Sequence, residues 1–130
     1  ELAFQIQKEY VRFTHFMPNV KTEVFFGGRN IRLDQEALAK HPAIVVGTPG
    51  RILDLIRRGW MKVDKLQHFV VDECDHIMES LSMRRDLQDI FMACPIDKQV
   101  MMFTATLPPE TKAVCLKFMK DVGSAAVRYE

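Results

Sequence analysis

The chain has 130 residues, 48% hydrophobic and 27% charged, a composition typical of one globular domain or part of one. Its 18 basic and 17 acidic side chains leave a net charge of +1, which argues against nucleic-acid binding through a broad basic field. Any binding of phosphate should therefore be local. No apolar stretch approaches the roughly twenty residues that span a bilayer, and we expect no membrane partner. The absence of a C-x-x-C pair argues against zinc and disulfides and favours a reducing compartment.

Apolar periodicity and turn residues predict alternating helices and strands. Ala3, Ile6 and Tyr10, for example, recur at helical spacing. Continuous apolar runs of about four residues are too short for buried helices and indicate buried strands. The expected order is a helix over 2–16, a strand over 21–26, a helix over 30–40, a strand over 43–46, a helix over 49–58, a strand over 69–71, a short helix over 75–80, a helix ending near 95, a strand over 100–103, a helix from 108 or 109, and a tail or linker over 122–130.

This alternation is that of βαβ units and predicts the α/β class, with a parallel sheet covered by helices on both faces. Four polar groups each follow the carboxyl end of an expected strand: Gly27-Gly28, Thr48-Pro49-Gly50-Arg51, Asp72-Glu73 and Thr104-Ala105-Thr106. Because those ends share one edge of a parallel sheet, we expect the four groups to converge there, where α/β sheets bind their ligands.

The third group is acidic, with Asp75 two residues beyond Asp72-Glu73. One carboxylate could hold Mg²⁺, which prefers oxygen ligands and keeps several waters. The other could orient the water that attacks a γ-phosphate. The alternative is that Asp72 caps the next helix and that the remaining acids interact with its dipole.

The first two groups suit the binding of phosphate. Gly27-Gly28 lets the main chain approach a phosphate closely, a helix that starts at Pro49 directs free N–H groups at an anion, and Arg51 adds a forked donor. Such contacts see the backbone of a nucleic acid and not its bases. The alternatives are an ordinary turn at 27–28, a simple helix cap at Thr48, and a strand end at 104–106 that bonds its own backbone.

In this order and spacing, the groups resemble motifs of the first RecA-like domain of a DEAD-box RNA helicase. Glu1-Leu2-Ala3 resembles the end of the P-T-R-E-L-A motif, Gly27-Gly28 the GG doublet, Thr48-Pro49-Gly50-Arg51 the T-P-G-R motif, Asp72-Glu73-Cys74-Asp75 the D-E-A-D motif and Thr104-Ala105-Thr106 the S-A-T motif. The resemblance runs from Glu1 to about Asp121.

Cys74 makes the tetrad D-E-C-D, which resembles a subgroup of nuclear helicases that act in spliceosome assembly and in mRNA export with the TREX complex. The resemblance implies ATP and Mg²⁺ as cofactors and a location in the nucleus. It implies RNA, the second RecA-like domain of the same chain, and splicing and export factors as partners.

The same resemblance implies roles for the motif residues. Asp72 would hold Mg²⁺ through water, and Glu73, also beside the metal, would position and activate the lytic water. Asp75 would couple hydrolysis to domain closure through Thr104 and Thr106, although Thr104 stands where the family has Ser. The residues that would contact the RNA backbone are Glu1, Leu2, Ala3, Gly27, Gly28, Thr48, Pro49, Gly50 and Arg51.

The sequence contains no G-x-x-x-x-G-K-[ST] loop and begins without Met. We therefore expect residues 1–121 to be a partial first RecA-like domain, from the end of motif Ia through motif III and the next helix, incomplete at its P-loop strand. The full-length protein would be an RNA-dependent ATPase and helicase, and the excerpt alone should be inactive. Two alternatives stay open: a non-catalytic module that binds the RNA backbone or docks a partner, and a metal hydrolase built on the acidic cluster, although no His or further acid falls at a matching strand end.

Overall fold

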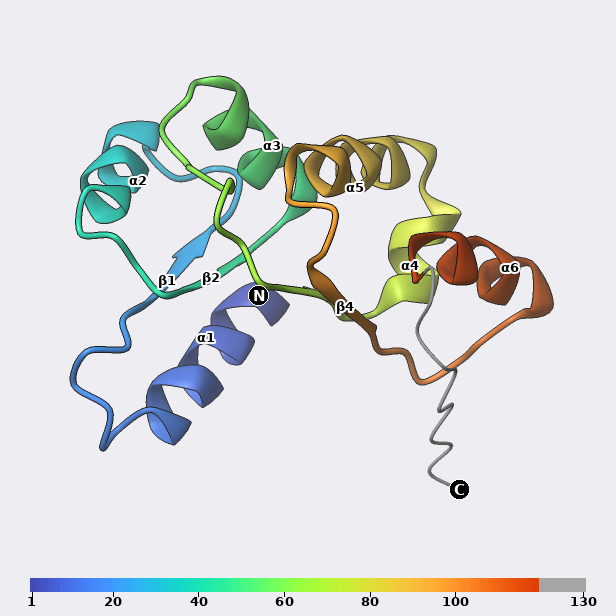
Figure 1. Cartoon of the computed structure of the whole chain (residues 1–130), viewed down its shortest axis with the longest axis horizontal. Coiled ribbons are helices and arrows are strands. Elements are labelled where there is room, and N and C mark those ends of the chain that lie inside the picture. Colours follow the sequence, from blue (N-terminus) through green and yellow to red (C-terminus); the bar gives the residue numbers. More distant parts are fainter. Residues whose placement is uncertain (120–130) are drawn as a thin grey trace.

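The computed structural model describes residues 1–119, so the tail or linker expected over 122–130 lies outside the described residues. Helices and strands alternate along most of this range, as predicted (Figure 1). The elements are α1 (Leu2–Phe13), β1 (Thr22–Phe25), α2 (Ile31–Leu38), β2 (Ile44–Gly47), α3 (Pro49–Arg57), β3 (His68–Val71), α4 (Cys74–Glu79), α5 (Leu81–Ala93), β4 (Gln99–Met102) and α6 (Pro109–Phe118).

All strand pairing in the described residues is parallel, which confirms the α/β class with parallel strands. β1 pairs with β2, and Thr22 lies opposite Ile44. β3 pairs with β4, and His68 lies opposite Gln99. The strands thus form two separate two-stranded sheets and not the single sheet that we expected, because within residues 1–119 no strand lies between the two pairs to bond them together.

The packing of α3 joins the two strand pairs through its two faces. On one face, Leu55 is fully buried beside Phe25 of β1. On the other, Leu53 enters a larger core that contains Phe69 of β3 and residues of the other C-terminal elements. The remaining buried members of that core are Val71, Cys74, Met78, Leu87, Ile90, Cys94, Val100 and Cys115. One helix therefore ties the β1–β2 half of the molecule to the β3–β4 half.

Helix termini follow the local signals in the sequence in most places. Asn30 caps α2, because its side-chain oxygen accepts a hydrogen bond of 3.0 Å from the Arg32 N–H. Pro49 occupies the first turn of α3, where its missing N–H does no harm. Ser80 caps α5 in the same way as Asn30 caps α2.

The first helix is shorter than expected and ends at Phe13 instead of residue 16. Thr14 explains the early stop, since its N–H and its hydroxyl both donate to the Tyr10 carbonyl, at 2.9 and 2.7 Å. No residue of α1 is buried among the described residues, although the helix is amphipathic as predicted. No helix in the described part of the chain is long and apolar enough to cross a membrane.

Candidate functional site

The acidic cluster lies where β3 ends and α4 begins. Phe69 and Val71 are buried and alternate with exposed residues, so the strand leaves Asp72 at the surface. Asp72 Oδ1 accepts a hydrogen bond of 2.9 Å from the Glu73 N–H. It does not cap α4 in the usual way, because the N-cap is Glu73 and no side-chain cap bond forms there.

Glu73 has a backbone conformation that side-chain-bearing residues rarely adopt. Its φ is 49° and its ψ is 46°, in the left-handed region. Such a residue costs on the order of 1 kcal/mol or more and persists only where its surroundings hold it. Here the Asp72 carboxylate binds the N–H of Glu73, and the next N–H, of Cys74, donates to the Phe103 carbonyl at 3.1 Å. The backbone at Glu73 is thus fixed from both sides.

A hydrogen-bond network connects the acidic cluster to the segment after β4. The Thr106 hydroxyl donates to Asp75 Oδ2, and the Thr104 hydroxyl donates to the Thr106 carbonyl at 2.6 Å. The Thr106 hydrogen bond, followed by a smaller contribution from Thr104, lowers the pKa of Asp75. The structure therefore contains the physical link between Asp75 and the 104–106 segment; its role in coupling is still a prediction.

Cys74, the residue that distinguishes the tetrad, faces the core. Its Sγ lies 3.6 Å from Sγ of Cys115 in α6, and the two residues are 1% and 4% exposed. Burial, reinforced by the neighbouring Cys115 thiol, raises the pKa of Cys74 to about 12. At neutral pH this thiol is therefore uncharged and packs as a small apolar group between α4 and α6.

The two glycine-containing turns lie side by side at the carboxyl ends of β1 and β2. The Thr48 N–H donates to the Phe25 carbonyl at 3.1 Å, which extends the pairing of the two strands into the turns. Gly28 has a φ of 82°, a conformation open to glycine at little cost. Thr48 is at the N-cap position of α3 but makes no side-chain cap bond, so its hydroxyl is not used for the capping role that was the alternative.

Arg51 is held inside the protein and does not project from it. Its Nη1 lies 2.8 Å from Asp34 Oδ2, and its Nη2 donates to the Arg29 carbonyl at 2.9 Å. The arginine side chain is 12% exposed and the Asp34 side chain is fully buried. In this arrangement Arg51 fixes the position of its turn. The sequence had suggested instead that its forked guanidinium binds phosphate.

Asp34 and Arg29 complete this cluster, and sequence reasoning missed both. The available signal was an acidic residue on the inward face of an amphipathic helix, between Ile31 and Ala37. An acid in such a position needs a charged partner. Two arginines, Arg29 and Arg51, were close enough in the chain to supply it.

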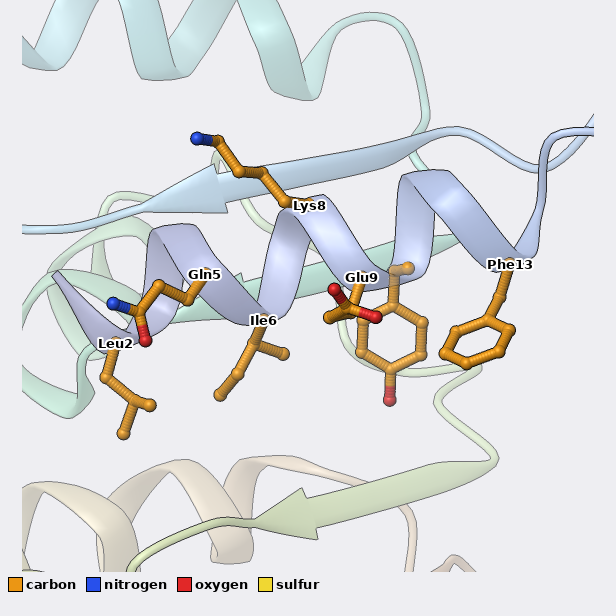
Figure 2. Close-up of a pocket in the computed structure, with 7 residues that line it drawn as sticks. Leu2, Gln5, Ile6, Lys8, Glu9 and Phe13 are labelled. Atoms are coloured by element: carbon orange, nitrogen blue, oxygen red, sulfur yellow. The ribbon is translucent and has the colours of Figure 1, made fainter.

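Glu1, Leu2 and Ala3 lie at the start of α1. The Glu1 carbonyl accepts hydrogen bonds of 3.1 Å from the N–H groups of Phe4 and Gln5. Leu2 lines an open, mainly apolar groove of about 700 Å³ along α1. Figure 2 shows Leu2, Ile6 and Phe13 projecting from the same side of the helix into this space.

The structure brings the predicted groups together in pairs. Gly27-Gly28 adjoins the turn at 48–51, and the acidic cluster adjoins 104–106. Within residues 1–119 no hydrogen bond or ion pair joins one pair of groups to the other. Figure 2 shows β1 (pale blue) and β3 (pale green) running in the same direction, which is the orientation that convergence on one edge requires.

The donor set at the acidic cluster fits one kind of metal site. Asp72 and Glu73 are exposed carboxylates at a strand end, and Asp72 Oδ2 has no hydrogen bond within residues 1–119. No group of three or more His, Cys, Asp or Glu side chains in the described residues could enclose a metal. One or two carboxylates suit Mg²⁺, which keeps waters and shares its sites with substrate phosphates. They do not make a dedicated all-protein cage.

Comparison with known proteins identifies relatives that match most of the chain. The family described as DEAD/DEAH box helicase matches residues 1–114. The human protein named ATP-dependent RNA helicase DDX39A is 56% identical over 122 residues, which cover 93% of this chain and 29% of that protein. The Schizosaccharomyces pombe protein named ATP-dependent RNA helicase uap56 is 53% identical over 124 residues, with the same coverage of 93% and 29%.

A solved structure agrees with these relatives. The crystal structure of a DEAD box protein from the hyperthermophile Methanococcus jannaschii superposes with a TM-score of 0.81 at 36% identity. The match covers 92% of this chain and 32% of that one. The chain therefore spans about a third or less of the length of the relatives that it matches.

Proposed function

This chain belongs to the DEAD/DEAH box helicase family, and from that premise we propose that it forms part of an ATP-dependent RNA helicase. The observation that carries the proposal is the hydrogen bond from Thr106 to Asp75, which ties the acidic tetrad to the segment after β4. In this reading, residues 1–121 belong to a first RecA-like domain, and the full-length protein couples ATP hydrolysis to RNA unwinding or RNA–protein remodelling.

The acidic tetrad is the hydrolytic part of the proposed site. Asp72 would hold Mg²⁺ through water, with Glu73 nearby, and the ion would supply positive charge to neutralise the phosphates of ATP. Glu73 orients the attacking water and accepts its proton. The left-handed backbone at Glu73, held by hydrogen bonds to Asp72 and to Phe103, fixes the direction in which the side chain leaves the main chain. Asp75 couples ATP hydrolysis to domain closure through its hydrogen-bond network with Thr104 and Thr106.

The two turns at the ends of β1 and β2 are the proposed RNA grip. Backbone N–H groups near Gly28 and at the start of α3, together with the Thr48 hydroxyl, face the phosphates. Glu1-Leu2-Ala3 adds contacts from α1. None of these groups reads a base edge, so binding is independent of sequence. Arg51 acts here by holding its turn, because its guanidinium is bound to Asp34 and to the Arg29 carbonyl.

The partners and the location follow from the D-E-C-D tetrad and from the human and fission-yeast relatives. The proposed partners are RNA, the second RecA-like domain of the same protein, and splicing and export factors. The proposed location is the nucleus. Identity of 56% and 53% to two proteins named as ATP-dependent RNA helicases supports this subgroup assignment.

The experiment that tests the function is Glu73→Gln in the full-length protein. Losing the group that organises the attacking water should lower the RNA-stimulated ATPase rate by about a hundredfold or more, with RNA binding retained. Glu79→Gln is the matched control, because Glu79 is an exposed glutamate at the end of the same helix and should leave the rate unchanged. A Glu73→Gln rate equal to wild type would argue for a module that binds RNA or a partner without chemistry.

A further inference from the structure

A fully buried carboxylate lies between the two turns of the proposed RNA grip. Asp34 sits in the middle of α2, and its side chain has no exposed surface. A buried ionised carboxylate is stable only when charged or hydrogen-bonded groups compensate it. Positively charged groups must therefore stay close to Asp34 for its carboxylate to remain ionised.

Both cations at Asp34 come from the turns themselves. Arg51, at the end of the T-P-G-R tetrad, makes the well-aligned contact at 2.8 Å to Oδ2. Arg29, which directly follows Gly28, places its Nε 3.2 Å from Oδ1. That oxygen accepts no well-aligned hydrogen bond, so Arg29 is held there mainly by charge.

A further bond closes the cluster into a ring. Arg51 Nη2 donates to the main-chain carbonyl of Arg29 at 2.9 Å, across 22 residues of sequence. Asp34 thus fixes the side chains from both turns, and Arg51 fixes the backbone of the other turn directly. These three residues therefore add to the pairing of β1 with β2 in fixing the separation between Gly28 and the first turn of α3.

We propose that Asp34 is a positioning residue for RNA binding, which holds the two phosphate-binding turns at a fixed separation. The inference rests on the proposed function, since it assumes that these turns bind RNA phosphates. Successive phosphates of one strand have a set spacing, so two binding turns that are already at that spacing lose less freedom on binding. Asp34 itself touches no RNA and acts only through Arg29 and Arg51.

The test is Asp34→Asn in the full-length protein, with binding of a fluorescently labelled oligouridylate measured by anisotropy. The change preserves shape but leaves two arginines facing a neutral group. We expect RNA affinity to fall about tenfold, the equivalent of one good charge-assisted contact. The ATPase kcat at saturating RNA should stay within about twofold of wild type, because the acidic tetrad is untouched. A residue needed only for folding would not raise the KM for RNA selectively.

Asp54→Asn is the matched control. Asp54 is on α3, and it pairs with Arg58 at 2.9 Å on the surface, where both side chains are nearly half exposed. Like Asp34→Asn, this variant removes one negative charge from the half of the molecule that contains the two turns. RNA affinity in this variant should equal that of wild type, since exposed pairs contribute little.

Two further variants separate the possible failures. Thr48→Val tests the proposed grip directly by removing a hydroxyl that faces RNA. If Thr48→Val weakens binding and Asp34→Asn does not, the positioning role is overturned and the proposed function stands. If neither changes affinity, both are overturned. Should Asp34→Asn fail to fold, Arg51→Lys replaces it as the test. This variant keeps a positive charge beside Asp34 but loses the hydrogen bond to the Arg29 carbonyl. Reduced RNA affinity with unchanged kcat would support the inference, and unchanged RNA affinity would overturn it.

Discussion

The Thr106 hydroxyl donates a hydrogen bond to the Asp75 carboxylate across 31 residues of sequence. It joins the end of the acidic tetrad, on α4, to the segment that follows β4. Parallel pairing of β3 with β4 makes this contact possible, because it brings both strand ends to the same side. A change in the position of one segment must therefore stretch or break a bond to the other.

Replacing Thr106 by Val should raise the pKa of Asp75 toward its ordinary value, since the Thr106 hydrogen bond is the main cause of the lowered pKa. A lowered pKa stabilises the folded protein above the unfolded pKa, about 3.8, and that stabilisation is lost as pH falls through the folded value. Thr106→Val should therefore show a weaker loss of stability in acid. NMR titration of isotope-labelled aspartate carboxyls measures the shift.

Thr104→Val is the comparison for this titration, because Thr104 is the second and smaller cause of the lowered pKa. Its effect on Asp75 should have the same direction and a smaller size. An equal or larger effect from Thr104→Val would contradict the dominance of the Thr106 bond.

Replacing Cys74 by Ala should lower the free energy of unfolding by about 1 kcal/mol, because a buried sulfur is lost beside Cys115. The chemistry of the acidic tetrad should survive, as Cys74 faces the core. A double-mutant cycle with Cys115→Ala, followed by urea unfolding, measures the coupling between the two thiols. Additive effects would show that the thiols pack independently of each other.

The same variant changes the response to alkali. A raised pKa stabilises the folded state below the unfolded value, 9.0, and that stabilisation is lost as pH rises toward the folded value of about 12. The wild-type protein should therefore lose stability across this range more steeply than Cys74→Ala does. Equal slopes would contradict a burial-raised pKa at Cys74.

Replacing Gly47 by Ala should destabilise the protein by about 1–3 kcal/mol, because the added methyl has no room. It would lie 2.5 Å from Ile52 Cδ1 and 2.6 Å from the Phe25 carbonyl oxygen. The carbonyl belongs to the paired strand and cannot move away without breaking the sheet. Gly27→Ala is the control for stability, since an added methyl there meets nothing within 4 Å. Thermal unfolding of the full-length variants compares the two.

Local signals in the sequence were sufficient for the order of the elements and for the ends of most of them. Asn30 and Pro49 mark helix starts through their own side chains, and the Val-rich runs before Gly47 and Asp72 indicate strands, because these effects act over only a few residues. The motif groups at strand ends could be read in the same way. Thr14 was the exception, since its hydroxyl bond to the Tyr10 carbonyl competes with the helix pattern.

Only the tertiary structure decided which distant side chains meet. The pairing of Asp34 with Arg51 depends on how α2 and α3 pack, and the contact of Cys74 with Cys115 depends on how α4 and α6 pack. The division of the strands into two pairs was decided at the same level. Strand and helix preferences belong to single residues and their near neighbours, whereas these contacts depend on the placement of whole elements, which no local pattern specifies. For that reason the sequence suggested that Arg51 donates hydrogen bonds to phosphate, whereas in the structure its guanidinium binds Asp34 and the Arg29 carbonyl.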